Sequence, residues 1–306
     1  MTAARDRRPG AAPGAGRLGI DVGGTKVALR AESGDGRVEE SSFVWGPLRD
    51  ADRDLAALAA HLEAAPGLTD VGAVGVAMPA TVGPDERVTA WPSRPAWAGL
   101  ALGPALRALF PGAAVAWADD GDLGALAEAD AAGCTDLLYL GVGTGIGGGL
   151  VLGGALCPGP GRGSFEIGHL VIDQDGPACV CGRRGCLQAT ASGPATLARA
   201  AALRGAPVTS DALRAGLRDR VPWAVAALDR TARALATAIV GVGELVHPER
   251  VLLGGGFAAG VPDLLAGVTA HLAALGRPGH PAPPLGPARL GALSSLRGAL
   301  LLAHRI

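Results

Sequence analysis

The feature that most constrains the fold of this chain is a pattern that occurs twice: an apolar run, a turn rich in glycine and threonine, and a second apolar run. In the first copy, Leu18–Asp21 and Val27–Ala31 flank the turn Gly23-Gly24-Thr25. In the second copy, Leu137–Val142 enters the turn Gly143–Gly149 before a further strand. Each copy predicts two strands joined by a tight turn. The repeat predicts a duplicated α/β fold with two lobes.

Shorter patterns predict the other elements of the two lobes. Apolar runs predict strands at Val38–Val44, Val71–Met78, Ala113–Ala118, Leu150–Leu152 and Val251–Leu253. Apolar residues at helical spacing predict helices at Asp54–Ala64, Leu102–Phe110, Ala195–Leu203, Ser210–Leu217, Trp223–Val246 and Leu296–His304. Asp120 or Asp122 would cap a helix that runs to Ala132, and the proline-rich stretch Arg277–Pro287 predicts a surface connection. We expect residues 17–118 with 291–306 to form a smaller lobe and residues 119–290 a larger one.

Composition argues against several classes of protein. Of the 306 residues, 49% are hydrophobic and 18% are charged, which is typical of a globular chain. The net charge of −1 argues against nucleic acid as a partner, and no apolar run is long enough to span a membrane. Residues 1–16 lack the apolar centre of a signal peptide, so we expect them to be a disordered tail on a cytoplasmic protein.

Three of the 5 cysteines lie close together in the sequence, at Cys179, Cys181 and Cys186. An odd number of cysteines without an export signal argues against a disulfide framework. The Cys-x-Cys-x₄-Cys spacing supplies three soft ligands, and His169, ten residues upstream of Cys179, completes a tetrahedral set. We therefore predict a structural zinc site, with three free thiols as the alternative.

The first glycine turn, Asp21 to Lys26, has the residue types of a phosphate site. Gly23 and Gly24 allow backbone N–H groups to approach an anion, and the Thr25 hydroxyl and the Lys26 amine add donors. Asp21, at the strand end, suits a Mg²⁺ ion bound through water. The alternative is an ordinary hairpin turn.

Two later glycine clusters follow strands in the same way. The second turn contains Gly143, Thr144, Gly145 and Gly147, and the third cluster is Gly254-Gly255-Gly256, which could receive the base or ribose of a nucleotide. The chain has no GxxxxGK[ST] phosphate loop and no protein-kinase motifs. If this chain binds ATP, it does so with hairpin turns.

Four segments in this order resemble the ROK family of sugar kinases and repressors: Asp21–Lys26, Gly143–Gly149, Glu166-Ile167-Gly168-His169 and Cys179–Cys186. The resemblance extends from Leu18 to Ala303 and implies the duplicated actin-like ATPase (ribonuclease H-like) fold. It further implies ATP bound in a cleft between the lobes, a sugar in the same cleft, and a homodimer or higher oligomer.

The resemblance also assigns roles to single residues. Asp119-Asp120-Gly-Asp122 with Glu128 is similar to the family pattern Asn-Asp-Ala-Asn…Glu, which makes Asp120 the general base that accepts the proton of the attacking hydroxyl. Glu166 and His169 resemble ligands of sugar hydroxyls, so His169 would serve both zinc and substrate. Without the surrounding motifs, the aspartates would be interpreted as helix caps.

Five positions on the substrate side depart from the family pattern. Asp119 stands where Asn is usual, Gln188 where a sugar-binding Glu is usual, and Phe165, Ser93 and Ala80 replace a small residue, an Asn and a Gly. We expect Asp119, Gln188, Ser93 and Ala80 to line the substrate site with Glu166 and His169. Altered hydrogen-bonding groups shift specificity strongly. We therefore predict a modified sugar or a C7-cyclitol, phosphorylated on a primary hydroxyl, with glucose as the alternative.

Two other functions deserve comparison with the kinase hypothesis. A ROK repressor needs a helix-turn-helix domain before the first turn, and only about 20 residues precede Asp21. A non-catalytic sugar-binding protein would not need Asp120. The sequence therefore favours an ATP-dependent kinase with ATP, Mg²⁺ and structural Zn²⁺ as its cofactors.

Overall fold

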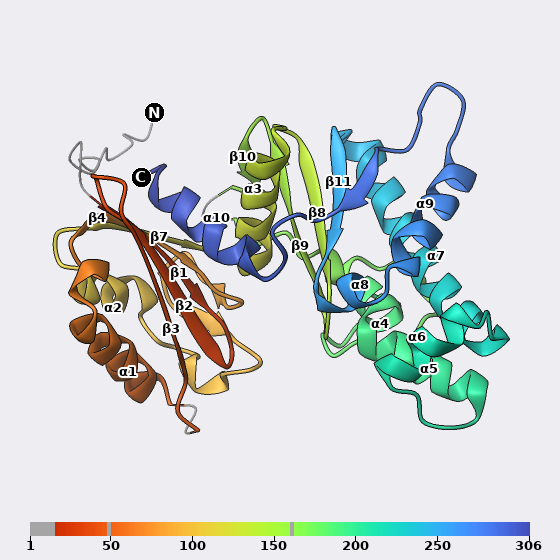
Figure 1. Cartoon of the computed structure of the whole chain (residues 1–306), viewed down its shortest axis with the longest axis horizontal. Helices are drawn as coiled ribbons and strands as arrows, with labels where there is room; N and C mark the ends of the chain where they lie inside the picture. Colours follow the sequence, from red (N-terminus) through yellow and green to blue (C-terminus); the bar gives the residue numbers. More distant parts are fainter. Residues whose placement is uncertain (1–15, 48–49, 160–161) are drawn as a thin grey trace. The chain divides into compact units, whose positions relative to one another are not determined.

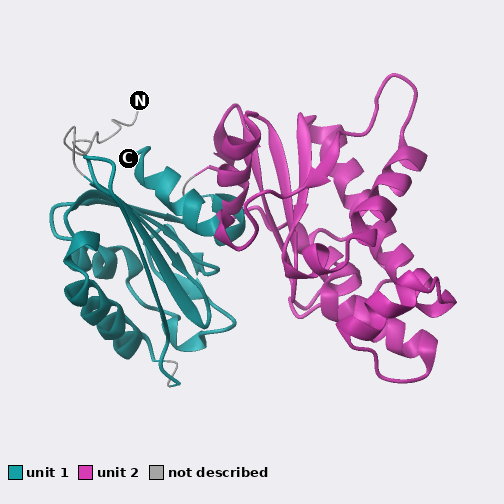
Figure 2. Cartoon of the chain, in the orientation of Figure 1, with its two compact units in different colours: residues 1–123, 160–163, 295–306 teal, residues 124–159, 164–294 magenta. Residues whose placement is uncertain are grey.

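The computed structural model describes residues 16–47, 50–159 and 162–306. The predicted tail, residues 1–16, lies outside the described residues except for Gly16. The chain forms two compact units (Figure 2). The first contains the chain up to Leu123 and the C-terminal segment Ser295–Ile306, and the second contains Gly124–Gly159 and Ser164–Ser294.

The first unit is built on a five-stranded sheet with the order β3-β2-β1-β4-β7. The strands β1, β2 and β3 form an antiparallel meander, whereas β4 and β7 run parallel to β1. A separate two-stranded sheet pairs β5 with β6. The bounds are β1 (Gly16–Val22), β2 (Lys26–Glu32), β3 (Val38–Val44), β4 (Val71–Ala77), β5 (Thr81–Val82), β6 (Val88–Ala90) and β7 (Ala114–Ala118).

Alternating side chains allow helices to cover both faces of this sheet. Leu18, Ile20 and Val22 of β1 pack into one core with the helices α1 (Ala51–Ala64) and α2 (Leu102–Leu109). The opposite face carries glycine at Gly19 and Gly75, where α10 (Ser294–Ala303) crosses the sheet (Figure 1). A Cβ atom at Gly75 would lie 1.9 Å from the Ala299 carbonyl oxygen, so only glycine permits this close packing.

The second unit repeats the same topology. Its sheet has the order β10-β9-β8-β11-β12, again with three antiparallel strands followed by two that run parallel to the first strand of the repeat. This match confirms the predicted internal duplication. The bounds are β8 (Leu137–Val142), β9 (Ile146–Leu152), β10 (Ala155–Cys157), β11 (Arg250–Gly254) and β12 (Leu285–Pro287).

Helices cover both faces of the second sheet (Figure 1). Leu138, Leu140 and Val142 of β8 pack into a core with α7 and α9, whereas Tyr139 points to the other face and contacts α3 near Gly124. The bounds are α3 (Asp120–Ala132), α4 (Leu187–Ala191), α5 (Gly193–Arg204), α6 (Ser210–Arg218), α7 (Pro222–Val246), α8 (Gly256–Gly260) and α9 (Asp263–Leu275). The 3₁₀ turns of the chain are η1 (Pro66–Leu68), η2 (Pro95–Trp97), η3 (Ile167–His169) and η4 (Gly291–Leu293).

Two local predictions need correction. The cap of α3 is Asp119, whose Oδ1 accepts a hydrogen bond from the Gly121 N–H at 2.9 Å; Asp120 and Asp122 lie inside the helix. The second glycine turn is shorter than predicted because Gly147 to Gly149 belong to β9. A Cβ at Gly148 would lie 2.3 Å from the Tyr139 carbonyl oxygen, so this glycine serves strand packing.

The proline-rich connection and the segment before it also contain elements that the sequence analysis missed. Residues Leu285–Pro287 form β12, an edge strand, where proline is tolerated because its missing N–H faces away from the sheet. The helix α9 was missed, although Leu264, Val268 and Leu272 repeat every four residues and form its buried face. Among the helices of the described residues, none is long and apolar enough to cross a membrane.

Candidate active site and metal centre

Parallel pairing brings the predicted nucleotide and base residues of the first unit to one edge of its sheet. Asp21, Ala77 and Ala118 are partners across β1, β4 and β7. Because these strands are parallel, the first glycine turn after β1 and the aspartate pair after β7 follow the carboxyl ends of the sheet. Asp120 is the first residue of α3, where a negative charge is favourable next to the helix N-terminus.

Asp120 lies close enough to Asp21 to affect its ionisation. Burial and, to a lesser extent, the charge of Asp120 together raise the pKa of Asp21 to about 6, and Lys26 opposes the shift. Thr25 and Lys26 are exposed at the turn. A cation beside Asp21 would relieve this unfavourable pairing of carboxylates, so the donor set fits a magnesium ion.

Two predicted substrate residues of the first unit have different surroundings. Ser93 is exposed and lies against the first turn, because a Cβ atom built on Gly24 would be 2.6 Å from the Ser93 Oγ. Ala80 is buried in the hydrophobic core of the unit. The structure therefore brings Ser93 against the first turn and places Ala80 in the hydrophobic core.

The sequence analysis missed three residues that support the first turn. Trp45 donates a hydrogen bond from Nε1 to the Gly23 carbonyl, and Arg94 donates from Nε to the Gly24 carbonyl. Arg94 in turn pairs with Asp54 in the core. One signal was available: Asp54, Leu58 and Leu62 share the buried face of α1, and an acidic residue on such a face requires a partner.

In the second unit, the short turn between β8 and β9 is fixed at both sides. The Gly143 N–H donates to the Gly145 carbonyl at 2.9 Å, and the Gly143 carbonyl accepts from the Gly193 N–H at the start of α5. Thr144 and Gly145 are exposed. The turn is therefore held by its own backbone and by α5, with its tip accessible.

The third glycine cluster lies at the same edge of the second sheet. Gly254 ends β11 opposite Gly141 of the parallel strand β8, and Gly256 begins α8. Gly255 adopts a φ of +87°, and a Cβ atom there would lie 2.5 Å from the backbone of Val142. Both the conformation and the close approach require glycine at this position.

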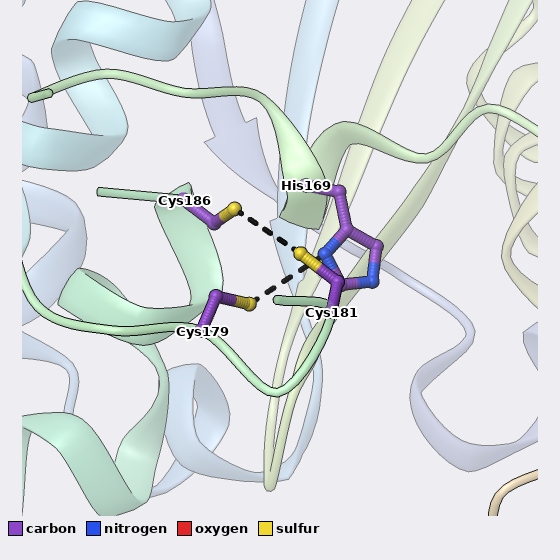
Figure 3. Close-up of side chains that lie close together, drawn as sticks. All are labelled: His169, Cys179, Cys181 and Cys186. Atoms are coloured by element: carbon purple, nitrogen blue, oxygen red, sulfur yellow. Dashed lines mark hydrogen bonds between the residues drawn. The ribbon is translucent and has the colours of Figure 1, made fainter. Parts of the chain in front are cut away.

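The predicted metal ligands form one cluster (Figure 3). Their ligand atoms all lie within 4.8 Å of one another, with Cys179 Sγ 3.7 Å from His169 Nδ1 and Cys181 Sγ 3.6 Å from Cys186 Sγ. Tetrahedral zinc, with bonds of about 2.0–2.3 Å, separates its ligand atoms by about 3.3–3.8 Å. These two contacts fit this geometry, and the use of Nδ1 leaves Nε2 of His169 for another partner.

Local contacts shift the pKa values of Cys179 and Cys186 in opposite directions. Burial opposes ionisation of Cys179, but hydrogen bonds from the Cys181 backbone, Gln188 and the neighbouring thiols lower its pKa to about 6. Burial and the neighbouring Cys181 and Cys179 raise the pKa of Cys186 to about 12. A cluster with one thiolate and neighbouring thiols favours capture of a soft cation, which then displaces the remaining protons.

Gln188 connects the cysteine cluster to the second turn. Its amide Nε2 donates to the Cys179 sulfur at 3.7 Å, while its Oε1 lies 3.1 Å from the position of a Cβ atom on Gly145. An amide can donate to the sulfur, whereas the ionised Glu that is usual in the family pattern cannot. Glu166 is exposed at the start of η3 and accepts from the Ser164 hydroxyl at 2.8 Å.

Glu128, the distal glutamate of the aspartate segment, has a structural environment. It is fully buried, and its two carboxylate oxygens accept hydrogen bonds from the Arg289 and Leu290 N–H groups and from the Ser294 hydroxyl. Three donors satisfy this buried carboxylate. Glu128 therefore fixes the segment that leads into α10.

Comparison with known proteins gives strong matches over almost the whole chain. The sequence model of the ROK family matches residues 17–306. The chain is 63% identical over 289 residues to the kanosamine kinase of Amycolatopsis mediterranei (strain S699), and the match covers 94% of this chain and 95% of that protein. It is 34% identical to an N-acetylmannosamine kinase of Escherichia coli, with 78% of this chain and 82% of that protein covered.

Solved structures agree with these matches. The ROK hexokinase from Thermus thermophilus has a TM-score of 0.82 and 32% identity, and covers 95% of this chain and 98% of its own. A ROK glucokinase from Streptomyces griseus, solved with glucose and AMPPNP, has a TM-score of 0.74 and 26% identity, and covers 95% of this chain and 100% of its own.

The raised pKa of Asp21 predicts a pH-dependent cost in stability. Between its unfolded value of 3.8 and its folded value of about 6, the folded chain retains a proton that the unfolded chain releases. The contribution of this group is therefore present below about pH 4 and is lost as the pH rises through about 6. We expect Asp21→Asn, without magnesium or nucleotide, to be more stable than the wild type at pH 7 by about 1–3 kcal/mol.

Urea unfolding of both chains at pH 4 and pH 7 measures this effect. The advantage of Asp21→Asn should shrink towards zero at pH 4, and Asp130→Asn, which changes an exposed residue of α3, should show no such difference. Equal stability of Asp21→Asn and the wild type at both pH values would contradict the prediction.

Proposed function

This chain belongs to the ROK family, and we propose that it phosphorylates a primary hydroxyl of an amino sugar of the kanosamine type. The chain is an ATP-dependent kinase of sugars or sugar-like molecules. The proposal concerns the identity of the sugar, the residues that perform the transfer and the metal ions that support it.

The observation that carries the choice of substrate is the 63% identity with a kanosamine kinase over nearly the full length of both chains. Kanosamine is a glucose in which an amino group replaces one ring hydroxyl. The E. coli relative is likewise named for a nitrogen-bearing sugar. These relatives favour an amino sugar over the C7-cyclitol and over glucose.

Asp119 gives this choice a physical basis. It places a carboxylate where the family pattern usually has an amide, and it lies directly after β7 beside the proposed base. A carboxylate forms a charge-assisted hydrogen bond with a protonated amine, which is stronger than the neutral bond of an Asn side chain. We propose that Asp119 recognises the amino group of the substrate.

Asp120 is the proposed general base. It would accept the proton of the attacking hydroxyl as the hydroxyl oxygen forms its bond to the γ-phosphorus and the bond to ADP breaks. The first turn and the second turn would hold phosphate oxygens through backbone N–H groups, and the third glycine cluster would receive the base or ribose. Magnesium, with Asp21 as its ligand through water, would neutralise phosphate charge.

Zinc is proposed for the cluster of His169, Cys179, Cys181 and Cys186. Four protein ligands leave no open position, so the ion would stabilise the fold around it and take no part in the transfer. Its ligand His169 could use Nε2 to bind a substrate hydroxyl, and Glu166 lies three residues upstream as a second candidate. Gln188 would donate a hydrogen bond to the Cys179 thiolate, and its other amide atom would lie beside Gly145 of the second turn.

We expect Asp120→Asn to lower kcat by about 10²–10⁴ because the amide cannot accept the hydroxyl proton. Binding of AMPPNP, measured by calorimetry, should persist, since Asp120 is not proposed to hold the nucleotide. Asp130→Asn on the same helix should retain wild-type turnover. Wild-type kcat in the Asp120→Asn variant would rule out this base and favour a different mechanism.

The role of Asp119 can be tested by the selectivity between kanosamine and glucose. The ratio of kcat/KM for kanosamine to that for glucose should fall at least about tenfold in Asp119→Asn, because only the charged partner of the amine is lost. Gln188→Glu, which introduces the usual residue at another position that departs from the family pattern, serves as the comparison variant. A wild-type chain that prefers glucose, or an unchanged ratio in Asp119→Asn, would contradict the amino-sugar proposal.

The metal proposal predicts one zinc ion per chain in the purified protein. Cys181→Ser should lose most of the zinc and raise the KM for the sugar by at least about tenfold, since His169 would lose its fixed orientation. Cys134→Ser, outside the cluster, should retain both. Metal analysis and sugar kinetics check these outcomes, and a zinc-free wild-type chain with full activity would exclude the proposal.

A further inference from the structure

Three successive carbonyl groups of the first turn accept hydrogen bonds from residues outside it. Trp45 Nε1 donates to the Gly23 carbonyl at 2.8 Å, and the Trp45 backbone N–H donates to the Thr25 carbonyl at 2.9 Å. Between them, Arg94 Nε donates to the Gly24 carbonyl at 3.1 Å. The direction of each peptide group in the turn is therefore fixed by a donor within the same unit.

Fixing a carbonyl also fixes an N–H, because the two point in opposite directions across a planar trans peptide. The Gly23 carbonyl shares its peptide with the Gly24 N–H, and the Gly24 carbonyl shares its peptide with the Thr25 N–H. Anchoring both carbonyls directs these two N–H groups away from Trp45 and Arg94. A donor on the carbonyl also polarises the peptide and strengthens its N–H as a donor.

Arg94 is buried together with its counter-charge. Arg94 and Asp54 are each only 2% exposed, and their side chains pair at 2.5 Å. The Trp97 indole N–H donates to the same Asp54 oxygen at 2.8 Å, and the Arg94 guanidinium lies 4.9 Å from the centre of the Trp45 ring. This packing holds the guanidinium with Nε at the Gly24 carbonyl.

We propose that Arg94, neutralised and held by Asp54, is a positioning residue that directs the Gly24 and Thr25 N–H groups at the phosphates of ATP. The proposal rests on the proposed function, in which this turn binds the nucleotide. Arg94 touches neither substrate, and it acts through the peptide of Gly24.

The Arg94–Asp54 ion pair supplies a hydrogen-bond donor to the first turn, which an apolar pair could not do. Replacement of a buried ion pair by apolar side chains of similar size is often neutral or stabilising, so burial of Arg94 and Asp54 is a weak argument for stability alone. Apolar side chains, however, offer no donor to the Gly24 carbonyl. The stability of the fold and the affinity for ATP should therefore separate when both members of the pair are replaced together.

The decisive variant is the double substitution Asp54→Leu/Arg94→Met. We expect the double variant to fold with a midpoint of thermal unfolding only slightly below that of the wild type, because the buried Trp97 N–H loses its acceptor. Its KM for ATP should rise at least about tenfold, and its kcat should change much less. The dissociation constant of AMPPNP, measured by calorimetry, should rise in parallel. A folded double variant with wild-type KM and wild-type AMPPNP affinity would overturn the proposal.

Two single variants keep the test informative if the double variant does not fold. Trp45→Phe removes the indole donor to Gly23 and should weaken ATP binding. Arg94→Lys keeps the charge beside Asp54 but loses the guanidinium Nε, and it should also raise the KM for ATP. Wild-type ATP affinity in both would count against the proposal.

The matched control is Glu86→Gln/Arg107→Gln, which removes another ion pair of the same unit and should leave the KM for ATP unchanged. Calorimetry with AMPPNP distinguishes failure of this inference from failure of the proposed function. A wild-type chain that binds AMPPNP but phosphorylates no sugar would refute the function while the variants still test Arg94.

Discussion

Each unit depends on a parallel strand pair in the middle of its sheet: β1 with β4 in the first unit and β8 with β11 in the second. In the first unit, β7 also runs parallel to β4, so the carboxyl ends of β1, β4 and β7 lie at the same edge of the sheet. In the second unit, β11 beside β8 does the same for the second turn and the third glycine cluster. Parallel strands need long crossover connections, and here helices supply them. The glycine turns and the aspartate segment inherit their positions from this arrangement.

Two pairs of charged groups lie near the first turn, one repulsive and one attractive. The charged form of Asp21 is destabilised by burial and by Asp120, and Lys26 offsets only part of this effect. Arg94 and Asp54 are more deeply buried, but each neutralises the other. The first pair is suited to an incoming cation, and the second to a permanent frame. Functional sites commonly retain unfavourable groups of the first kind while the surrounding fold stabilises them.

The second unit connects its metal cluster to its glycine turn through short-range contacts. η3 carries His169 and packs on β9, and α4 begins directly after Cys186. Gln188, on α4, reaches both the Cys179 sulfur and the region of Gly145. A metal ion in this cluster would therefore fix a loop, a short helix and the approach to the turn together. This is how a structural ion could influence catalysis without touching the reacting atoms.

Patterns within short stretches of sequence were sufficient for much of the fold. The repeated strand, glycine turn and strand predicted the duplication, and the cysteine spacing with His169 predicted the cluster, because periodicity and spacing are local properties. Local rules also misplaced some features: the glycines of β9 were assigned to a turn, although they serve close strand packing.

Only the tertiary structure decided which side chains work together. Arg94 lies 40 residues from Asp54 and 70 residues from Gly24, and the pKa of Asp21 depends on Asp120. No local pattern encodes such contacts, because they arise when packing closes long stretches of chain around one core. The sequence by itself thus determined the repeated scaffold and the types of residue at its turns. Tertiary packing determined their partners, their burial and their charge, since each depends on neighbours distant in sequence.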